Sequence, residues 1–123
     1  MKKLFVVSAL FIATMASAQN FTRRDSLQGG LRPERTSYDV QRYDLNITID
    51  PDKKTIKGYN DITFKATSAT SRIQVDLFAN MKVDGVSLDK FKTIYKRDND
   101  AVFISFDKPL EKDKEYTLRF SYS

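Results

Sequence analysis

The stretch that decides the fold is YDLNITIDPDKKTIKGYNDITFKA, residues 43–66. Apolar and polar residues alternate on both sides of a Pro-Asp-Lys-Lys tract, and this alternation is typical of strands that bury one face. We therefore expect two antiparallel strands joined by a four-residue loop at residues 51–54.

The two strands agree on a single register. If Asp50 lies opposite Thr55, every apolar residue of one strand faces the same side as the apolar residues of the other,. A slip of one residue would turn one row to the opposite face. The expected inward face consists of Tyr43, Leu45, Ile47, Ile49, Ile56, Gly58, Asn60, Ile62, Phe64 and Ala66. Asn60, opposite Leu45, is its polar exception.

Alternation with a period of two continues to the end of the sequence. It recurs in residues 72–77, 81–88, 91–96, 101–106 and 116–122, with turns expected at Asp89-Lys90 and at Asp98-Asn99-Asp100,. Residues 19–37 show little apolar periodicity, so we expect them to form an extended leader without a helix. Residues 38–123 are predicted to form an all-β fold, an antiparallel β-sandwich or part of one.

The first 18 residues have the three-part pattern of a secretory signal peptide. Two lysines are followed by an apolar run over residues 4–15 and by Ala16-Ser17-Ala18,. A membrane anchor is the competing interpretation, but a spanning helix needs about 20 apolar residues. We expect cleavage after Ala18 and an exported protein, periplasmic or secreted, with no membrane span after cleavage.

Composition excludes several classes of function. The 21 basic residues are interspersed with 16 acidic ones for a net charge of +5, and no basic stripe predicts nucleic-acid binding,. The chain has no cysteine, so no disulfide supports its core, and no histidine, so a Ser-His-Asp arrangement is impossible,. We therefore predict no catalytic, cofactor-binding or metal-binding residue in this sequence.

Two acidic turns offer a different kind of metal site. Asp50-Pro51-Asp52 and Asp98-Asn99-Asp100 could supply oxygen ligands to calcium, although neither has the full ligand series of a calcium loop,. Asp and Asn also favour turns because they hydrogen-bond to their own backbone. Glu111 and Glu115 lie in a lysine-rich loop and are interpreted as surface charge.

Three aromatic residues suggest a binding function. Tyr59, Tyr95 and Phe103 are expected on faces opposite the main apolar rows, where exposed rings could form a carbohydrate platform. A single aromatic residue in such a place more often packs under a neighbouring loop. The alternative function is therefore a free-standing exported β-sandwich that binds carbohydrate or a partner protein.

Five segments occur in an order that indicates a known family. They are DVQRYDLNITID (39–50), IKGYNDITF (56–64), IQVDL (73–77), VDGVSLD (83–89) and KPLEKDKEYTLRFSYS (108–123). Together they resemble the start of the aminopeptidase N family of zinc metallopeptidases. The sequence departs from the family pattern at three positions. Asn60 stands where an apolar residue is usual, Lys90 where Asp-Gly or Asn-Gly is common, and Asp113 where Gly is common.

The resemblance implies a longer parent enzyme. Its saddle-like N-terminal β domain, of which this chain is about the first half, would precede a catalytic domain with an H-E-x-x-H zinc motif. That motif is absent here, so zinc is expected only in the parent, which would remove N-terminal amino acids from peptides. The expected partners are the catalytic domain of the same chain and, through the parent, the peptide substrate; the expected role is structural, covering the catalytic cleft.

The resemblance also leads to an expectation about strand edges. If later strands are missing, AVFISF (101–106) and YTLRFSY (116–122) would lack the neighbours that cover them. Uncovered strands with little charge pair with other chains. We therefore expect residues 19–123 alone to self-associate.

Overall fold

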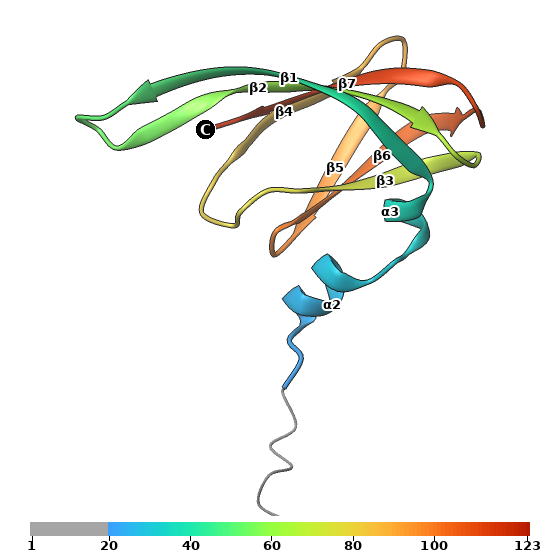
Figure 1. Ribbon diagram of the computed structural model, residues 1–123, viewed down its shortest axis with the longest axis horizontal. Helices are drawn as coiled ribbons and strands as arrows, with labels where there is room; N and C mark the ends of the chain where they lie inside the picture. Colours follow the sequence, from blue (N-terminus) through green and yellow to red (C-terminus); the bar gives the residue numbers. More distant parts are fainter. Residues whose placement is uncertain (1–19) are drawn as a thin grey trace, which may run out of the picture.

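The computed structural model describes residues 20–123, in which two short helices precede seven strands (Figure 1). The helices are α2 (Arg23–Gly29) and α3 (Pro33–Thr36). The strands are β1 (Tyr38–Asp50), β2 (Thr55–Ala66), β3 (Thr70–Asp76), β4 (Val83–Leu88), β5 (Thr93–Asp98), β6 (Ala101–Leu110) and β7 (Glu115–Tyr122). The expected signal peptide, residues 1–18, and its cleavage site lie outside the described residues. From residue 20 onward, no helix is long and apolar enough to cross a membrane.

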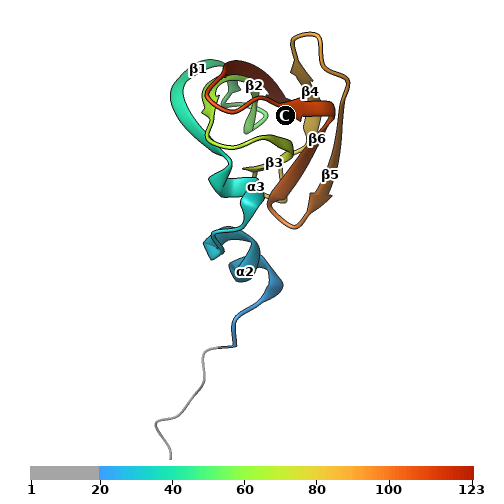
Figure 2. The same cartoon turned by 90° about the vertical axis from the view of Figure 1, so that its right-hand side faces the viewer.

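The strands form two antiparallel sheets, as the alternation predicts. One has four strands in the order β1-β2-β7-β4, and the other has three in the order β3-β6-β5. The four-stranded sheet lies across the top of Figure 1, with the three-stranded sheet beneath it. Figure 2 shows from the side that both helices lie below the strands and lead into β1, and the packing of Leu27 on Ala101 and Phe103 places α2 against the outer face of the three-stranded sheet.

The core lies between the two sheets. Alternate residues of β2, β3, β6 and β7 point into it and are buried, as a strand with one covered face requires,. The buried members of this cluster are Ile62, Phe64, Ala66, Ile73, Val83, Leu88, Val102, Ile104, Phe106, Leu110, Leu118 and Phe120.

The register expected for the first hairpin is confirmed. Asp50 lies opposite Thr55, Ile49 opposite Ile56, and Leu45 opposite Asn60. Residues 51–54 form the loop. Lys54 adopts a positive φ of 52° there, and the Asp50 side chain accepts a hydrogen bond from the backbone N–H of Lys53 at 3.0 Å.

The expectation for the strands AVFISF and YTLRFSY is wrong. β6, which contains the first, lies between β3 and β5, and β7 lies between β2 and β4, so both are paired on each side. The edges of the sheets are β1, β4, β3 and β5. Alternation cannot reveal this, because it reports which face is buried and not which strand lies beside which.

The expectation of an extended leader in residues 19–37 is also wrong, because α2 and α3 occupy most of its described part. Thr22 caps α2: its side chain accepts a hydrogen bond from the Asp25 N–H, and the Asp25 carboxylate accepts one from the Thr22 N–H,. Leu27 is the only buried residue of α2 and packs on Ala101 and Phe103. One buried residue in a seven-residue helix produces no detectable periodicity.

Candidate functional site

The described residues contain no metal-binding constellation. Within residues 20–123, no group of three or more His, Cys, Asp or Glu side chains is close enough to hold a metal ion. The sequence has neither His nor Cys, the usual zinc ligands,. The residues present therefore do not fit the zinc that the family resemblance implies.

The acidic turn between β5 and β6 is occupied by arginines from the leader. The Arg23 guanidinium donates to the Asp98 carboxylate at 2.9 Å, and these hydrogen bonds hold the pKa of Asp98 below its ordinary value,. The buried Asp100 accepts from Arg24, from Gln28 at 2.9 Å and from the Ala79 N–H at 2.7 Å. This turn therefore serves to anchor α2 to the sandwich.

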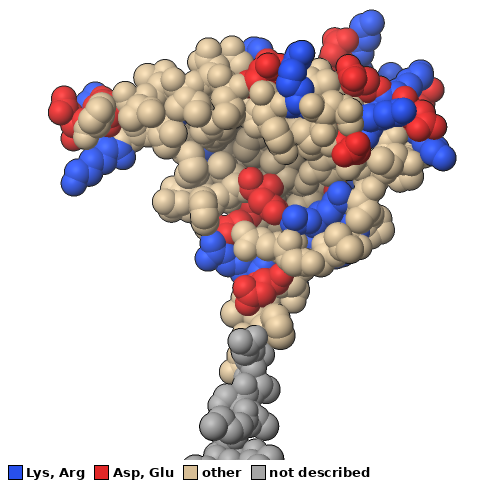
Figure 3. Space-filling model, viewed as in Figure 1, with Lys and Arg blue, Asp and Glu red and all other residues tan. Residues whose placement is uncertain are grey.

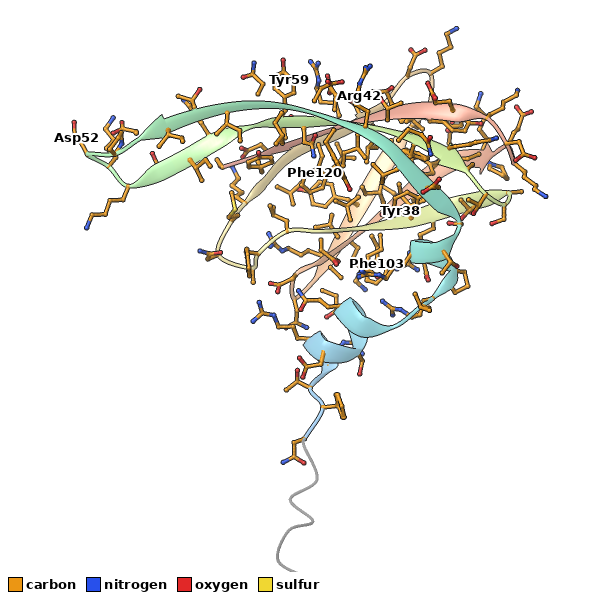
Figure 4. The ribbon with its side chains drawn as sticks, in the orientation of Figure 1. Tyr38, Arg42, Asp52, Tyr59, Phe103 and Phe120 are labelled. Carbon is orange, nitrogen blue, oxygen red and sulfur yellow. The ribbon has the colours of Figure 1, made fainter. Side chains whose placement is uncertain are left out.

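The three candidate aromatic residues do not form one platform. Phe103 is buried beside Leu27, with the Arg72 guanidinium 4.4 Å from its ring centre. Tyr95 lies opposite Ile104, so it is on the core side of β5 and not on the expected outer side. Tyr59 is on the outer face of the four-stranded sheet, opposite in direction to Phe120 (Figure 4). Phe103 therefore lies on the expected face but is buried there, and Tyr95 is exposed, at 46%, but lies on the other face from the one expected.

On the outer face around Tyr59, an ion pair joins the neighbouring strands β2 and β7. Arg119 donates two hydrogen bonds to the Asp61 carboxylate, at 2.8 and 2.7 Å, and its guanidinium carbon lies 4.0 Å from the centre of the Tyr59 ring. The same hydrogen bonds lower the pKa of Asp61 and raise that of Arg119.

Glu111 forms an exposed ion pair with Lys114 at 2.7 Å, as expected for surface charge.

A further exposed surface is the inner face of the first hairpin. Pairing between β2 and β7 ends at Gly58, so Ile49 and Ile56 extend past β7, and Tyr43, Leu45 and Ile47 lie on the edge strand β1 beside residues of β2 that β7 still pairs. Their apolar side chains keep between 39% and 68% of their surface exposed. We call these five side chains the apolar overhang: Tyr43, Leu45, Ile47, Ile49 and Ile56.

Charged residues are absent from the apolar overhang. In Figure 3 acidic and basic groups gather at the loop of the hairpin and on the body, and the stretch between them is uncharged. Asp52, labelled in Figure 4, marks the loop. A run of exposed, uncharged, apolar side chains on a single face is typical of an interaction surface.

A hollow lies where the apolar overhang meets the body. It has a volume of about 430 Å³, and its lining includes Tyr43, Asn60, Ile62 and Asp76. The Asn60 Oδ1 atom is buried and accepts no hydrogen bond. On the body side, the Tyr38 hydroxyl donates to the Gln74 carbonyl at 2.6 Å.

Sequence reasoning missed the residues that anchor the leader, above all Asp100 and Gln74. The buried Gln74 side chain donates to the Leu27 carbonyl at 3.0 Å and accepts from Arg32 at 2.8 Å. The Thr22-x-x-Asp25 spacing was the available signal, because it is a variant of the helix capping box,. Nothing in the sequence pairs Arg23 and Arg24 with a turn 75 residues away.

Comparison with known sequences and structures identifies the fold. The profile of the family described as Peptidase M1 N-terminal domain matches residues 39–123. No curated protein matches the chain.

Solved structures agree with the family match. A mutant two-domain M1 zinc metallopeptidase bound to L-arginine has a TM-score of 0.63 and 24% identity over 72% of this chain. A mutant M1 zinc metallopeptidase from Deinococcus radiodurans, bound to a Tyr-Ser-Ala substrate, has a TM-score of 0.61 and 25% identity over 70% of this chain. The match spans about a fifth of each of those proteins, 21% and 20% respectively.

Proposed function

The chain belongs to the Peptidase M1 N-terminal domain family, and from this membership we propose that it is the non-catalytic N-terminal β domain of an exported zinc aminopeptidase. The observation that carries the proposal is the family match over residues 39–123. In this proposal the parent enzyme removes N-terminal amino acids from peptides, and this domain helps to cover the catalytic cleft.

The chemistry of the chain supports a structural role. A metallopeptidase needs a bound metal to activate water and polarise the substrate carbonyl, and these 123 residues contain neither His nor Cys. Zinc and the peptide-cleaving groups therefore belong to the rest of the parent. The free-standing carbohydrate-binding alternative has no comparable support, because Tyr59, Tyr95 and Phe103 do not share a surface.

The proposal is tested by extending the protein. The coding DNA beyond Ser123 is expected to continue in frame to an H-E-x-x-H motif. The parent enzyme, once purified, is expected to release amino acids from aminoacyl-nitroanilides in a chelator-sensitive reaction, and residues 19–123 alone are expected to release none. A parent frame without the motif, or chelator-sensitive hydrolysis by the short chain, would contradict the proposal.

Export is a separate part of the proposal and rests on the pattern of residues 1–18,. The mature protein is expected to begin at Gln19 and to be recovered from the periplasm or the medium. N-terminal sequencing of the fractionated protein measures both, and an intact Met1 in the cytoplasmic fraction would contradict export.

A further inference from the structure

We propose that a hollow between the leader and the outer face of the three-stranded sheet binds a dianionic phosphoryl group, either free phosphate or the phosphomonoester headgroup of a lipid. The hollow has a volume of about 230 Å³. We call it the basic hollow, and its charged lining consists of Arg23, Arg32, Arg72, Lys96, Glu34 and Asp98. This inference goes beyond the proposed function and does not depend on it, because neither the site nor its test involves peptide cleavage.

The pairing of the strands gathers the basic side chains around one aromatic ring. Phe103 on β6 lies opposite Gln74 on β3 and opposite Lys96 on β5, so these three residues form one row across the outer face. Arg72 precedes Gln74 by two residues and therefore lies on the same face of β3,. Figure 4 shows Phe103 between the strands and α2, and α2 contributes the other wall of the basic hollow.

The cations of the basic hollow differ from the arginines that anchor the leader. Three leader arginines each form an ion pair with a carboxylate of the sandwich: Arg23, Arg24 and Arg35. In contrast, Arg32, Arg72 and Lys96 form no ion pair within residues 20–123. No carboxylate of the described chain therefore neutralises these three charges at contact distance.

The unpaired charge of the basic hollow matches a phosphate dianion. With Arg23 and Asp98 paired to each other, the lining keeps three cations and the Glu34 carboxylate, for an unpaired charge of +2. A phosphate monoester carries a charge of about −1.5 to −2 at pH 7, whereas a single carboxylate would neutralise only half of the unpaired charge. Guanidinium groups also bind two phosphate oxygens at once, in a planar fork.

The two unpaired arginines are held in place before any ligand binds. Their guanidinium carbons lie 5.4 Å (Arg32) and 4.4 Å (Arg72) from the centre of the Phe103 ring,. Arg32 also donates to the Gln74 side chain at 2.8 Å, and Gln74, which is 2% exposed, donates in turn to the Leu27 carbonyl. Side chains that are already ordered lose little conformational freedom when an anion binds, so binding is stronger.

The test is phosphorus NMR titration of inorganic phosphate into the full-length protein, as wild type and as single variants. Arg72→Gln and Lys96→Gln each remove one unpaired charge at an exposed position. Arg42→Gln and Lys57→Gln are the matched controls, because they remove the same charges from exposed positions on β1 and β2 of the other sheet.

We expect the wild type to bind phosphate saturably, and each variant of the basic hollow to bind it at least about tenfold more weakly, as expected for loss of a hydrogen bond to a charged group. The controls are expected to bind like the wild type. Absence of saturable binding in the wild type would overturn the inference, and so would equal losses in the variants and their controls. If Arg72→Gln does not fold, Lys96→Gln, on a different strand, decides the test.

Co-sedimentation with vesicles distinguishes the two sources of the phosphoryl group. If a lipid headgroup is the ligand, the wild type sediments with phosphatidylcholine vesicles that contain phosphatidic acid, and Arg72→Gln and Lys96→Gln remain in solution. Phosphate binding without co-sedimentation would assign the site to free phosphate. Co-sedimentation that neither substitution reduces would overturn the assignment of lipid binding to the basic hollow.

Discussion

Asn60 lies on the inner face of β2, between Gly58 and Ile62, where its neighbours bury apolar surface. Its Oδ1 atom is buried without a donor. Leaving a polar group without a partner costs about 1–3 kcal/mol. The side chain is therefore expected to weaken the hairpin.

Asn60→Val is expected to stabilise the 123-residue chain by about 1 kcal/mol, because it removes the unpaired amide and adds a residue that favours strands. Urea unfolding measures the difference. Asn46→Val, at an exposed position on the outer face of β1, is the matched control and is expected to change stability by less than about 0.5 kcal/mol. A loss of stability in Asn60→Val would show that Asn60 already has a partner.

Tyr38 is a titratable group whose environment favours its neutral form. Burial is the main cause that raises the pKa of Tyr38 to about 12, and its hydroxyl donates to the Gln74 carbonyl. Because the folded-state pKa lies above the ordinary value of 10.0, the contribution of this group is complete below pH 10 and is lost as pH rises toward 12,.

Tyr38→Phe is expected to lower stability by about 1 kcal/mol at pH 7, through loss of the hydrogen bond to Gln74. It is also expected to remove part of the fall in stability between pH 10 and 12. Urea unfolding of both proteins at pH 7, 10, 11 and 12 gives the difference between their profiles, which cancels the titration of the lysines. Parallel profiles would mean that Tyr38 does not titrate differently in the folded state.

At the scale of elements, the β1–β2 hairpin was the most predictable part of the molecule. Two independent alternating rows and a Pro-containing loop determine one register, and the structure has that register. The leader was poorly predicted because α2 is held by ion pairs with Asp98 and Asp100, and such long-range pairs leave no periodic trace in the sequence.

Gly58 is the residue on which the close approach of these two strands depends. A Cβ atom at this position would lie 1.9 Å from the Asn46 carbonyl oxygen and 3.1 Å from the Ile47 Cα. Backbone atoms cannot move aside as the end of a flexible side chain can. The close approach of the β1 backbone therefore explains why the I-x-G segment has glycine at position 58.

Gly58→Ala is expected to destabilise the chain by about 1–3 kcal/mol, the usual cost of overpacking. Gly85 is also a strand glycine, but a Cβ there would meet nothing within 4 Å. Gly85→Ala is therefore the matched control and is expected to be close to neutral. Thermal and urea unfolding measure both, and equal effects of the two substitutions would refute the steric argument.

At the scale of the whole molecule, the sequence predicts the fold class and the buried rows, because burial on one face imposes alternation on every strand. It does not predict that the four-stranded sheet is longer than the other. Ile47 and Ile104 have the same pattern in the sequence, but Ile104 is buried and Ile47 is 42% exposed. Their difference depends on which strand lies across the core, and that is a property of the assembled sheets.

Because β6 and β7 are paired on both sides, we now expect the apolar overhang, and not these strands, to cause self-association. Residues 19–123 are expected to associate above micromolar concentrations through the exposed face of β1 and β2. Ile49→Lys is expected to reduce this association, and Ile94→Lys, on the other sheet, to have little effect. Light scattering over a concentration series measures both; a wild-type chain that remains monomeric throughout would contradict the prediction.

The direction of the strands has a mechanical consequence. β1 and β7 run the same way on either side of β2, so β1 begins at one end of the sheet and β7 finishes at the other. A force that pulls residues 38 and 123 apart loads both ladders in shear, and the hydrogen bonds of each ladder must break together. The sheet is therefore expected to resist a force along its strands more than a force that would open the hydrogen bonds one at a time. A force applied instead at residue 20 loads the leader, which side chains rather than a strand ladder hold in place, so the leader is then expected to detach before the sheet yields.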